Sequence, residues 1–166
     1  MRSRFLPEGR LLHTPENEAA CASCDGLRRA MEEGTVLEGV AQLCDGAHNL
    51  LVSVGPFTGF LPREEAALGI AEGTTREIAI LSRVGKPVCF QITALEESEG
   101  VLRPRLSRRR AQQAALDAML AGLHPGCILP AVVTHLESFG AFVDIGCGVP
   151  SLIGIENISV SRIPHP

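Results

Sequence analysis

The sequence predicts a mainly β protein made of two barrel units in tandem, with a helical N-terminal arm and a linking helix. Three observations predict this fold class: short strand-like segments between turn signals, a helical segment in mid-chain, and a second set of strand segments that repeats the first. The chain has 166 residues, of which 45% are hydrophobic and 20% charged. That balance supplies packed cores for two small domains and does not indicate disorder.

Residues 1–33 form the predicted helical arm. Thr14-Pro15-Glu16 reads as a helix N-cap followed by proline at the first helical position. Helix-forming residues continue past Gly26 and stop before Gly34. We expect this arm to pack against the neighbouring barrel and assign it no chemistry.

Residues 34–107 form the first predicted barrel. Three strand segments, at 35–43, 49–54 and 58–61, precede a short helix at 62–68. The chain then returns to extended character through 76–82 and 87–95, which together stand for the fourth strand, and a last strand follows at 100–107. Five strands with a short helix between the third and the fourth are the layout of an OB barrel, so we expect residues 35–107 to close into one.

The linking helix and the second barrel occupy the remaining chain. Ser107 is an expected N-cap for a helix that occupies the linker at 108–125. Segments 34–40 and 52–55 align with 126–132 and 143–146, a period that suits tandem domains. The second copy reaches residue 166 with only its first three strands, so we expect an incomplete barrel with an open or covered edge.

The net charge of −4 and the pI near 5.7 argue against nucleic-acid binding through bulk positive charge. Any such binding is expected to be local. The most basic stretch holds five arginines, namely Arg103, Arg105, Arg108, Arg109 and Arg110. A solvated charged surface is the alternative interpretation of this stretch.

Neither membrane segments nor a metal site is predicted. The first twelve residues lack the apolar core of a signal peptide, and no run reaches the length of a membrane span, so a cytoplasmic location is expected. Six cysteines are expected to be reduced. Cys21 and Cys24 form a C-x-x-C pair, but no second pair or histidine doublet follows at a suitable spacing, so we predict no metal and no cofactor.

Residues 126–159 read GCILPAVVTHLESFGAFVDIGCGVPSLIGIENIS and strongly resemble the first three strands of an S1 RNA-binding domain, most specifically in the run F-G-A-F-V-D. The segment from Leu61 to Pro87 further resembles the small multi-S1, ribosomal-protein-S1-like proteins of Firmicutes. The resemblance implies tandem S1-type OB-fold barrels, the second one truncated, and single-stranded RNA binding on strands two and three.

The residues expected to contact RNA follow from this resemblance and from the chemistry of stacking. Phe139 and Phe142 begin and end the F-G-A-F run, and we expect Gly140 to permit a bend or bulge that brings both rings to one surface for bases to stack on. A core position is the alternative for each of the two rings, and Phe139 is the preferred stacking residue. The resemblance carries the strand-five arginine over to Arg103. Gly154 replaces the family's histidine, which leaves three weaker polar candidates, Asn157, Ser159 and Arg162.

The first barrel departs from the pattern because His48 and Leu51 stand where the second unit has its two phenylalanines. We expect it to bind RNA more weakly, with His48 as a candidate contact.

The functional prediction is a non-catalytic protein that binds single-stranded RNA. The expected ligand is mRNA at the ribosome, and no membrane and no small-molecule substrate is expected as a partner. No phosphate-binding loop, nucleophile elbow or carboxylate cluster for metal ions is present in the sequence. Two alternatives stay open: the RNA-tethering module of an enzyme whose catalytic domain is absent, and an OB-fold scaffold for protein interactions.

Overall fold

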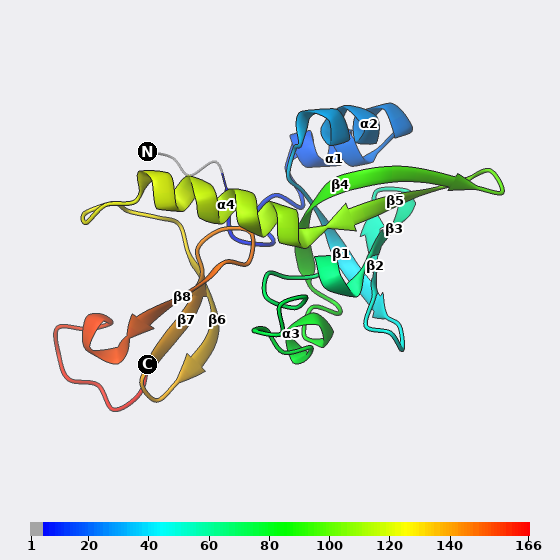
Figure 1. Cartoon of the computed structure of the whole chain (residues 1–166). Helices are drawn as coiled ribbons and strands as arrows, with labels where there is room; N and C mark the ends of the chain where they lie inside the picture. The colour runs from blue at the N-terminus through cyan, green and yellow to red at the C-terminus, as the bar shows by residue number, and fades with distance from the viewer. Residues whose placement is uncertain (1–4) are drawn as a thin grey trace.

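The structure is a computed structural model and describes residues 5–166 (Figure 1). The first four residues of the predicted arm lie outside the described residues. Two short helices, α1 (Pro15–Cys21) and α2 (Cys24–Glu33), replace the single helix expected there. The Thr14 side chain caps α1 as predicted, but the helix ends at Ala22 and the Ser23 hydroxyl caps α2 by accepting from the Gly26 N–H.

The first unit is a closed five-stranded barrel, which confirms the predicted closure and the mainly β fold class. Its sheet order is β1-β2-β3-β5-β4, and β3 and β5 close it by pairing in parallel at Phe60 and Arg105. The strands are β1 (Leu37–Cys44), β2 (Leu50–Val54), β3 (Phe57–Leu61), β4 (Pro87–Ser98) and β5 (Val101–Ser107).

The barrel interior is filled by one apolar cluster. Leu50, Leu61, Phe90 and Leu106 are fully buried in it, and Leu27 of α2 packs against them from outside the sheet. Removal of these large side chains from water is the main stabilising contribution to this unit. The β4–β5 hairpin extends beyond the barrel in Figure 1.

The connection between β3 and β4 corrects one expectation. It contains the 3₁₀ helix η1 (Arg63–Glu65) and the short helix α3 (Ile78–Leu81), whereas residues 76–82 were predicted to be extended. Ile80 is buried in the barrel core. A run of β-branched and apolar residues fits a buried helical turn as well as a strand, so tertiary packing decides between them.

The linking helix α4 (Arg108–Gly122) begins where the sequence predicts, with the Ser107 hydroxyl accepting from the Arg110 N–H. It leads to a three-stranded antiparallel sheet of order β6-β7-β8 and then to the 3₁₀ helix η2 (Ile155–Asn157). The three strands are β6 (Val132–Glu137), β7 (Gly140–Asp144) and β8 (Pro150–Gly154).

The strand β6 starts later than the sequence repeat suggests. In the first unit, Leu37, Glu38 and Gly39 belong to β1, where they pair with β4. Their counterparts at 129–131 find no such partner among the described residues and stay outside the sheet, and the neighbouring Ile128 is 91% exposed. A strand needs a hydrogen-bonding neighbour. The two repeats therefore match in sequence here, but β6 is shorter than β1.

A buried ion pair joins the two units. Glu8 lies in the N-terminal segment, and both of its carboxylate oxygens accept from the Arg108 guanidinium, at 2.6 Å from Nε and 2.9 Å from Nη2. The Glu8 N–H donates to Asp144 Oδ2 at 2.8 Å, and the Cys89 N–H donates to Glu8 at 3.0 Å. The first barrel, the linking helix and the second sheet therefore meet at one residue, Glu8, whose carboxylate binds Arg108 and Cys89 and whose backbone N–H binds Asp144.

The protonation of this junction is set by its geometry. Burial by itself would raise the pKa of Glu8, but the charge and hydrogen bonds of Arg108, together with Arg83 and the Cys89 N–H, hold that pKa below its usual value. Burial alone would lower the pKa of Arg108, which Glu8 raises instead. Both partners therefore stay charged. Without Glu8, Arg108 would be a buried unpaired charge, and without Arg108, Glu8 would keep only Arg83, 3.5 Å away.

A second buried carboxylate, Glu38 of β1, anchors the N-terminal segment on the first barrel. Its Oε2 accepts from the backbone N–H groups of Gly9, Leu11 and Leu12 at 2.9–3.2 Å, while Oε1 has no hydrogen-bond partner within the described residues. Burial raises the pKa of Glu38 to about 7, although these N–H groups oppose the rise. The folded protein therefore binds this proton more tightly than the unfolded chain does.

We expect Glu38 to make the free energy of unfolding depend on pH. Its contribution is fully present below the pKa of the unfolded chain, about 4.3, and is lost as the pH rises through about 7. Between about pH 5 and pH 8 the wild type should lose about 1 to 3 kcal/mol more than Glu38→Gln does. Urea unfolding of both proteins at the two pH values measures this, and identical pH dependences would contradict it.

No helix within residues 5–166 is long and apolar enough to cross a membrane.

Candidate nucleic-acid interface

Three rings lie together on the outward face of the second sheet. Phe142 of β7 stacks on His135 of β6, with ring centroids 6.3 Å apart and planes 30° from parallel. Phe139 meets Phe142 edge-on, at 6.2 Å and 85°. Phe139 is 53% exposed and His135 is exposed, while Ala141 and Val143 alternate with Phe142 and are buried. The strand that carries Phe142 is therefore anchored by its buried residues, while the rings of Phe139 and His135 stay accessible to solvent.

The two phenylalanines meet for a different reason from the one predicted. Gly140 does not form a bulge, because β7 pairs with β8 without interruption from Gly140 onward. Phe139 instead lies in the turn that precedes β7, which frees it from strand alternation. Gly140 is required by close packing, since a Cβ there would lie 2.4 Å from the carbonyl oxygen of Ile153.

A β-bulge in β6 sets the position of His135. The register shifts between Val133 and His135, so that His135 stands opposite Phe142 and Thr134 is the extra residue. The Thr134 hydroxyl donates to the Phe142 carbonyl at 3.3 Å. Without the shift, Thr134 would take the place opposite Phe142, so the bulge is what adds a third ring to the cluster.

The first barrel repeats this bulge with other side chains. Its register shifts between Ala41 and Leu43, which places Leu43 opposite Leu51, and Leu51 in turn pairs with Phe60. The Arg105 guanidinium lies over the Phe60 ring, 5.7 Å from its centroid. The corresponding surface of the first unit thus carries one aromatic ring and a cation.

His48, the candidate contact in the first barrel, is engaged by the protein itself. Its ring forms an ion pair with Glu77 when protonated, and Glu77 also accepts from Arg63. The hydrogen bond and charge of Arg63 hold the pKa of Glu77 below its usual value. His48 is therefore tied to the β3–β4 connection.

The five arginines occupy three kinds of position. Arg103 and Arg105 are exposed on β5, where they alternate with buried residues, and Arg105 also lies 3.5 Å from Glu96. Arg110 is exposed, and Arg109 pairs with Glu72 at 2.7 Å. Arg108 is buried against Glu8, so its guanidinium is not accessible to a phosphate. We attribute a structural role to it.

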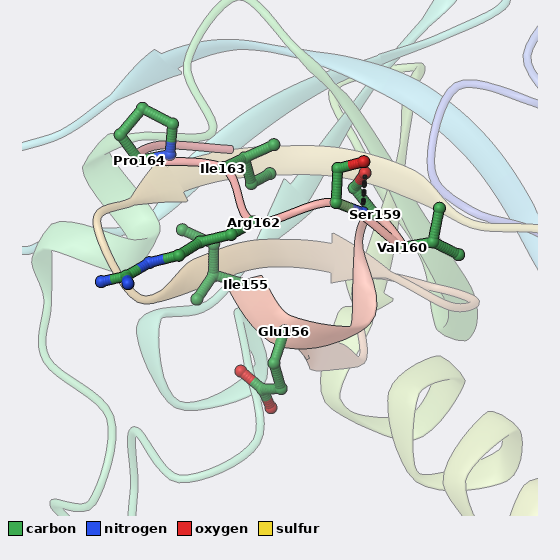
Figure 2. A pocket seen from close by; sticks show the side chains of 8 residues that line it. Ile155, Glu156, Ser159, Val160, Arg162, Ile163 and Pro164 are labelled. Atoms are coloured by element: carbon green, nitrogen blue, oxygen red, sulfur yellow. Dashed lines mark hydrogen bonds between the residues drawn. The ribbon is translucent and has the colours of Figure 1, made fainter.

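Two of the three polar candidates after β8, Ser159 and Arg162, line a hollow. It has a volume of about 750 Å³ and is lined by Ile155, Glu156, Ser159, Val160, Ser161, Arg162, Ile163 and Pro164. Figure 2 shows the Arg162 side chain reaching away from Ser159, whose hydroxyl accepts from the Ser161 N–H. Asn157 donates to Glu156 at 3.1 Å and lies outside the lining.

The two cysteines of the C-x-x-C pair lie in different environments. Cys21 is buried in the barrel core, where burial raises the pKa of its thiol to about 11, and Cys24 is exposed. Within residues 5–166, no group of three or more His, Cys, Asp or Glu side chains could hold a metal ion.

Comparison with known proteins finds relatives of one kind. The chain is 31% identical to the small ribosomal subunit protein bS1 of Leuconostoc lactis over 134 residues, which is 80% of this chain and 29% of the relative. It is 29% identical to bS1 of Mycobacterium tuberculosis H37Rv, over 96% of the chain and 32% of the relative. With bS1 of Neisseria meningitidis serogroup B, the identity is 27% over 91% of the chain and 26% of the relative.

These relatives, taken with the closed barrel of order β1-β2-β3-β5-β4, decide the kind of protein. The chain is an S1-like OB-fold protein. It spans about a quarter to a third of the length of the bS1 relatives that it matches. No family model matches the sequence. A solved structure that it resembles is GSP13 from Bacillus subtilis, at 20% identity and a TM-score of 0.35, with 58% of this chain and 64% of that one covered.

Sequence reasoning on this S1-like chain missed His135. It faces outward because of strand register, and the register depends on a bulge that no local motif reveals. One signal was present: Leu43 and His135 stand at matching places in the two repeats, so the position of either predicts that of the other.

Proposed function

We propose that this protein binds single-stranded RNA on the outward face of β6 and β7, in the cytoplasm and without catalysing a reaction. The observation that carries the proposal is the cluster formed by Phe139, Phe142 and His135. Exposed aromatic rings are costly to leave in water, and the chain has only 4% aromatic residues, so three adjacent rings on one surface need a function.

Base stacking is the function that suits this surface. A nucleobase that stacks on an aromatic side chain gains about 1 to 3 kcal/mol, whatever its identity, because every base has a π-face. Bases within a duplex are already stacked and cannot reach the rings. Phe139 should contribute most because its ring is the more exposed of the two phenylalanines and its edge contact with Phe142 leaves one face free.

Arg103, Arg105 and Arg110 complete the proposal as phosphate contacts. They are exposed, whereas Arg109 is shared with Glu72. Arg105 over Phe60 gives the first barrel a mixed cationic and aromatic surface, which supports a weaker second contact there. The polar residues Asn157, at the end of η2, and Arg162, in the lining of the hollow, are further candidates.

We further propose that the bound RNA is mRNA and that the protein acts at the ribosome, with residues 34–107 and 126–166 as its two functional units. Support comes from the relatives, whose name places them in the small ribosomal subunit. The net charge of −4 is compatible with this function because stacking, unlike counterion release, needs no excess of positive charge.

The salt dependence of RNA affinity tests the proposal. The double variant Arg103→Gln/Arg105→Gln should reduce the slope of log affinity against log salt by about 0.7 for each phosphate that the variant no longer neutralises. Fluorescence anisotropy of a labelled single-stranded RNA, over a series of salt concentrations, measures the slope for the wild type and the variant. An unchanged slope would remove these arginines from the interface, and absence of binding to any single-stranded RNA at low salt would contradict the proposed function itself.

A further inference from the structure

The exposed histidine of the ring cluster is held in place on two sides. His135 stacks on Phe142 at 6.3 Å, and its Nε2 lies 2.6 Å from Glu137 Oε1 in the same strand. An ionised carboxylate only accepts hydrogen bonds, so Nε2–H is the donor and this contact limits the rotation of the ring. A solvated surface histidine would have neither contact.

The spacing of the three rings limits how a nucleic acid can use them. Neighbouring centroids are 6.2 and 6.3 Å apart, whereas directly stacked bases follow one another at about 3.4 Å. Two bases stacked on each other therefore cannot match two neighbouring rings. A strand that engages the cluster must be locally unstacked, with each base resting on a protein ring rather than on the next base.

The two units of the chain differ at this position in an informative way. The bulge in the first barrel places Leu43 opposite Leu51. The matching bulge in the second unit places His135 opposite Phe142. The side chains of Leu43 and His135 are both exposed. A leucine at this position can pack on a neighbour but has no π-face to offer a ligand. The difference between Leu43 and His135 should therefore affect ligand contact more than folding.

We propose that His135 is a third base-stacking position, that Glu137 positions its ring, and that the cluster holds three consecutive unstacked bases across β6 and β7. This inference rests on the proposed RNA-binding function. It assigns the outermost subsite to His135.

The variant His135→Leu tests the stacking role because it introduces the residue that the first barrel already has at the matching place. Affinity for a single-stranded RNA should fall about 5- to 100-fold, the change expected when one base no longer stacks. The control Leu43→Ala removes an exposed side chain at the equivalent bulge and should change the affinity less than twofold. Thermal unfolding should show that both variants fold as the wild type does.

A second readout separates stacking from a merely structural effect. With oligonucleotides of increasing length, from about two to eight nucleotides, affinity for the wild type should rise until the ring cluster is filled. For His135→Leu the rise should stop one nucleotide earlier. An unchanged length dependence, or an affinity equal to that of the wild type, would show that His135 contacts no base.

The role of Glu137 is tested by two substitutions with opposite predictions. Glu137→Ala frees the His135 ring and should lower the affinity, whereas Glu137→Gln keeps an acceptor for Nε2–H and should not. If both variants bind RNA more tightly, the carboxylate only repels phosphate, and the positioning role is wrong. An equal fall in affinity in both would also contradict it, because the acceptor would then be irrelevant.

The same titrations distinguish failure of this inference from failure of the proposed function. If Phe139→Ala loses affinity and His135→Leu does not, the RNA site stands without a third ring. If neither variant loses affinity, the outward face of β6 and β7 is not the RNA site at all.

Discussion

Arg108→Met should destabilise the protein by about 3 to 5 kcal/mol, the largest effect expected of any single substitution discussed. It leaves the Glu8 carboxylate buried with only Arg83, 3.5 Å away, as a charged partner. The side chains of Glu8 and Arg108 are at most 6% exposed in the wild type. It also removes the hydrogen bond from Nη1 to the Ala66 carbonyl. The free energy of unfolding in urea measures the destabilisation, since urea adds no ionic screening.

The matched control is Arg110→Met, two positions further along the same helix. Arg110 is exposed, so its replacement should change the free energy of unfolding by about 0.5 kcal/mol or less. The double variant Glu8→Gln/Arg108→Met should be destabilised by less than the sum of the two single variants. Each single variant leaves the remaining charge of the pair buried without this partner, and the double variant removes both charges. A destabilisation by Arg108→Met no larger than that by Arg110→Met would contradict the buried junction.

Part of this structure could be read directly from the sequence. Strand-like segments separated by Gly and Asp-Gly turns predicted a closed barrel, and both helix caps, at Thr14 and Ser107, lie where short-range patterns place them. These features depend on residues close together in the chain. The S1 resemblance of residues 126–159 similarly depends on a local run of residues.

The features that sequence did not predict depend on contacts between distant residues. Arg108 looks like one member of a solvated basic stretch, and only Glu8, a hundred positions away, shows that it is buried. Residues 76–82 carry strand-like side chains, yet Ile80 reaches the core from a helical turn. The bulge that turns His135 toward Phe142 is visible only in the strand register.

The largest effect on RNA binding is expected at Phe139. Phe139→Ala should weaken binding of single-stranded RNA by about 1 to 3 kcal/mol, which is the value of one stacked base. The effect should be nearly independent of salt because stacking releases no counterions. Phe139 is 53% exposed, so the substitution should leave the free energy of unfolding almost unchanged. In that respect it differs from Arg108→Met, which should act on stability first.

The most direct test of the central claim compares Phe139→Ala with the wild type on two ligands, a single-stranded RNA and a duplex of the same sequence. Anisotropy titrations at one salt concentration give the two affinities, and circular dichroism checks the fold of the variant. The account predicts that affinity falls about 5- to 100-fold for the single strand and changes little for the duplex. Equal affinity of folded Phe139→Ala and the wild type for the single strand would contradict it.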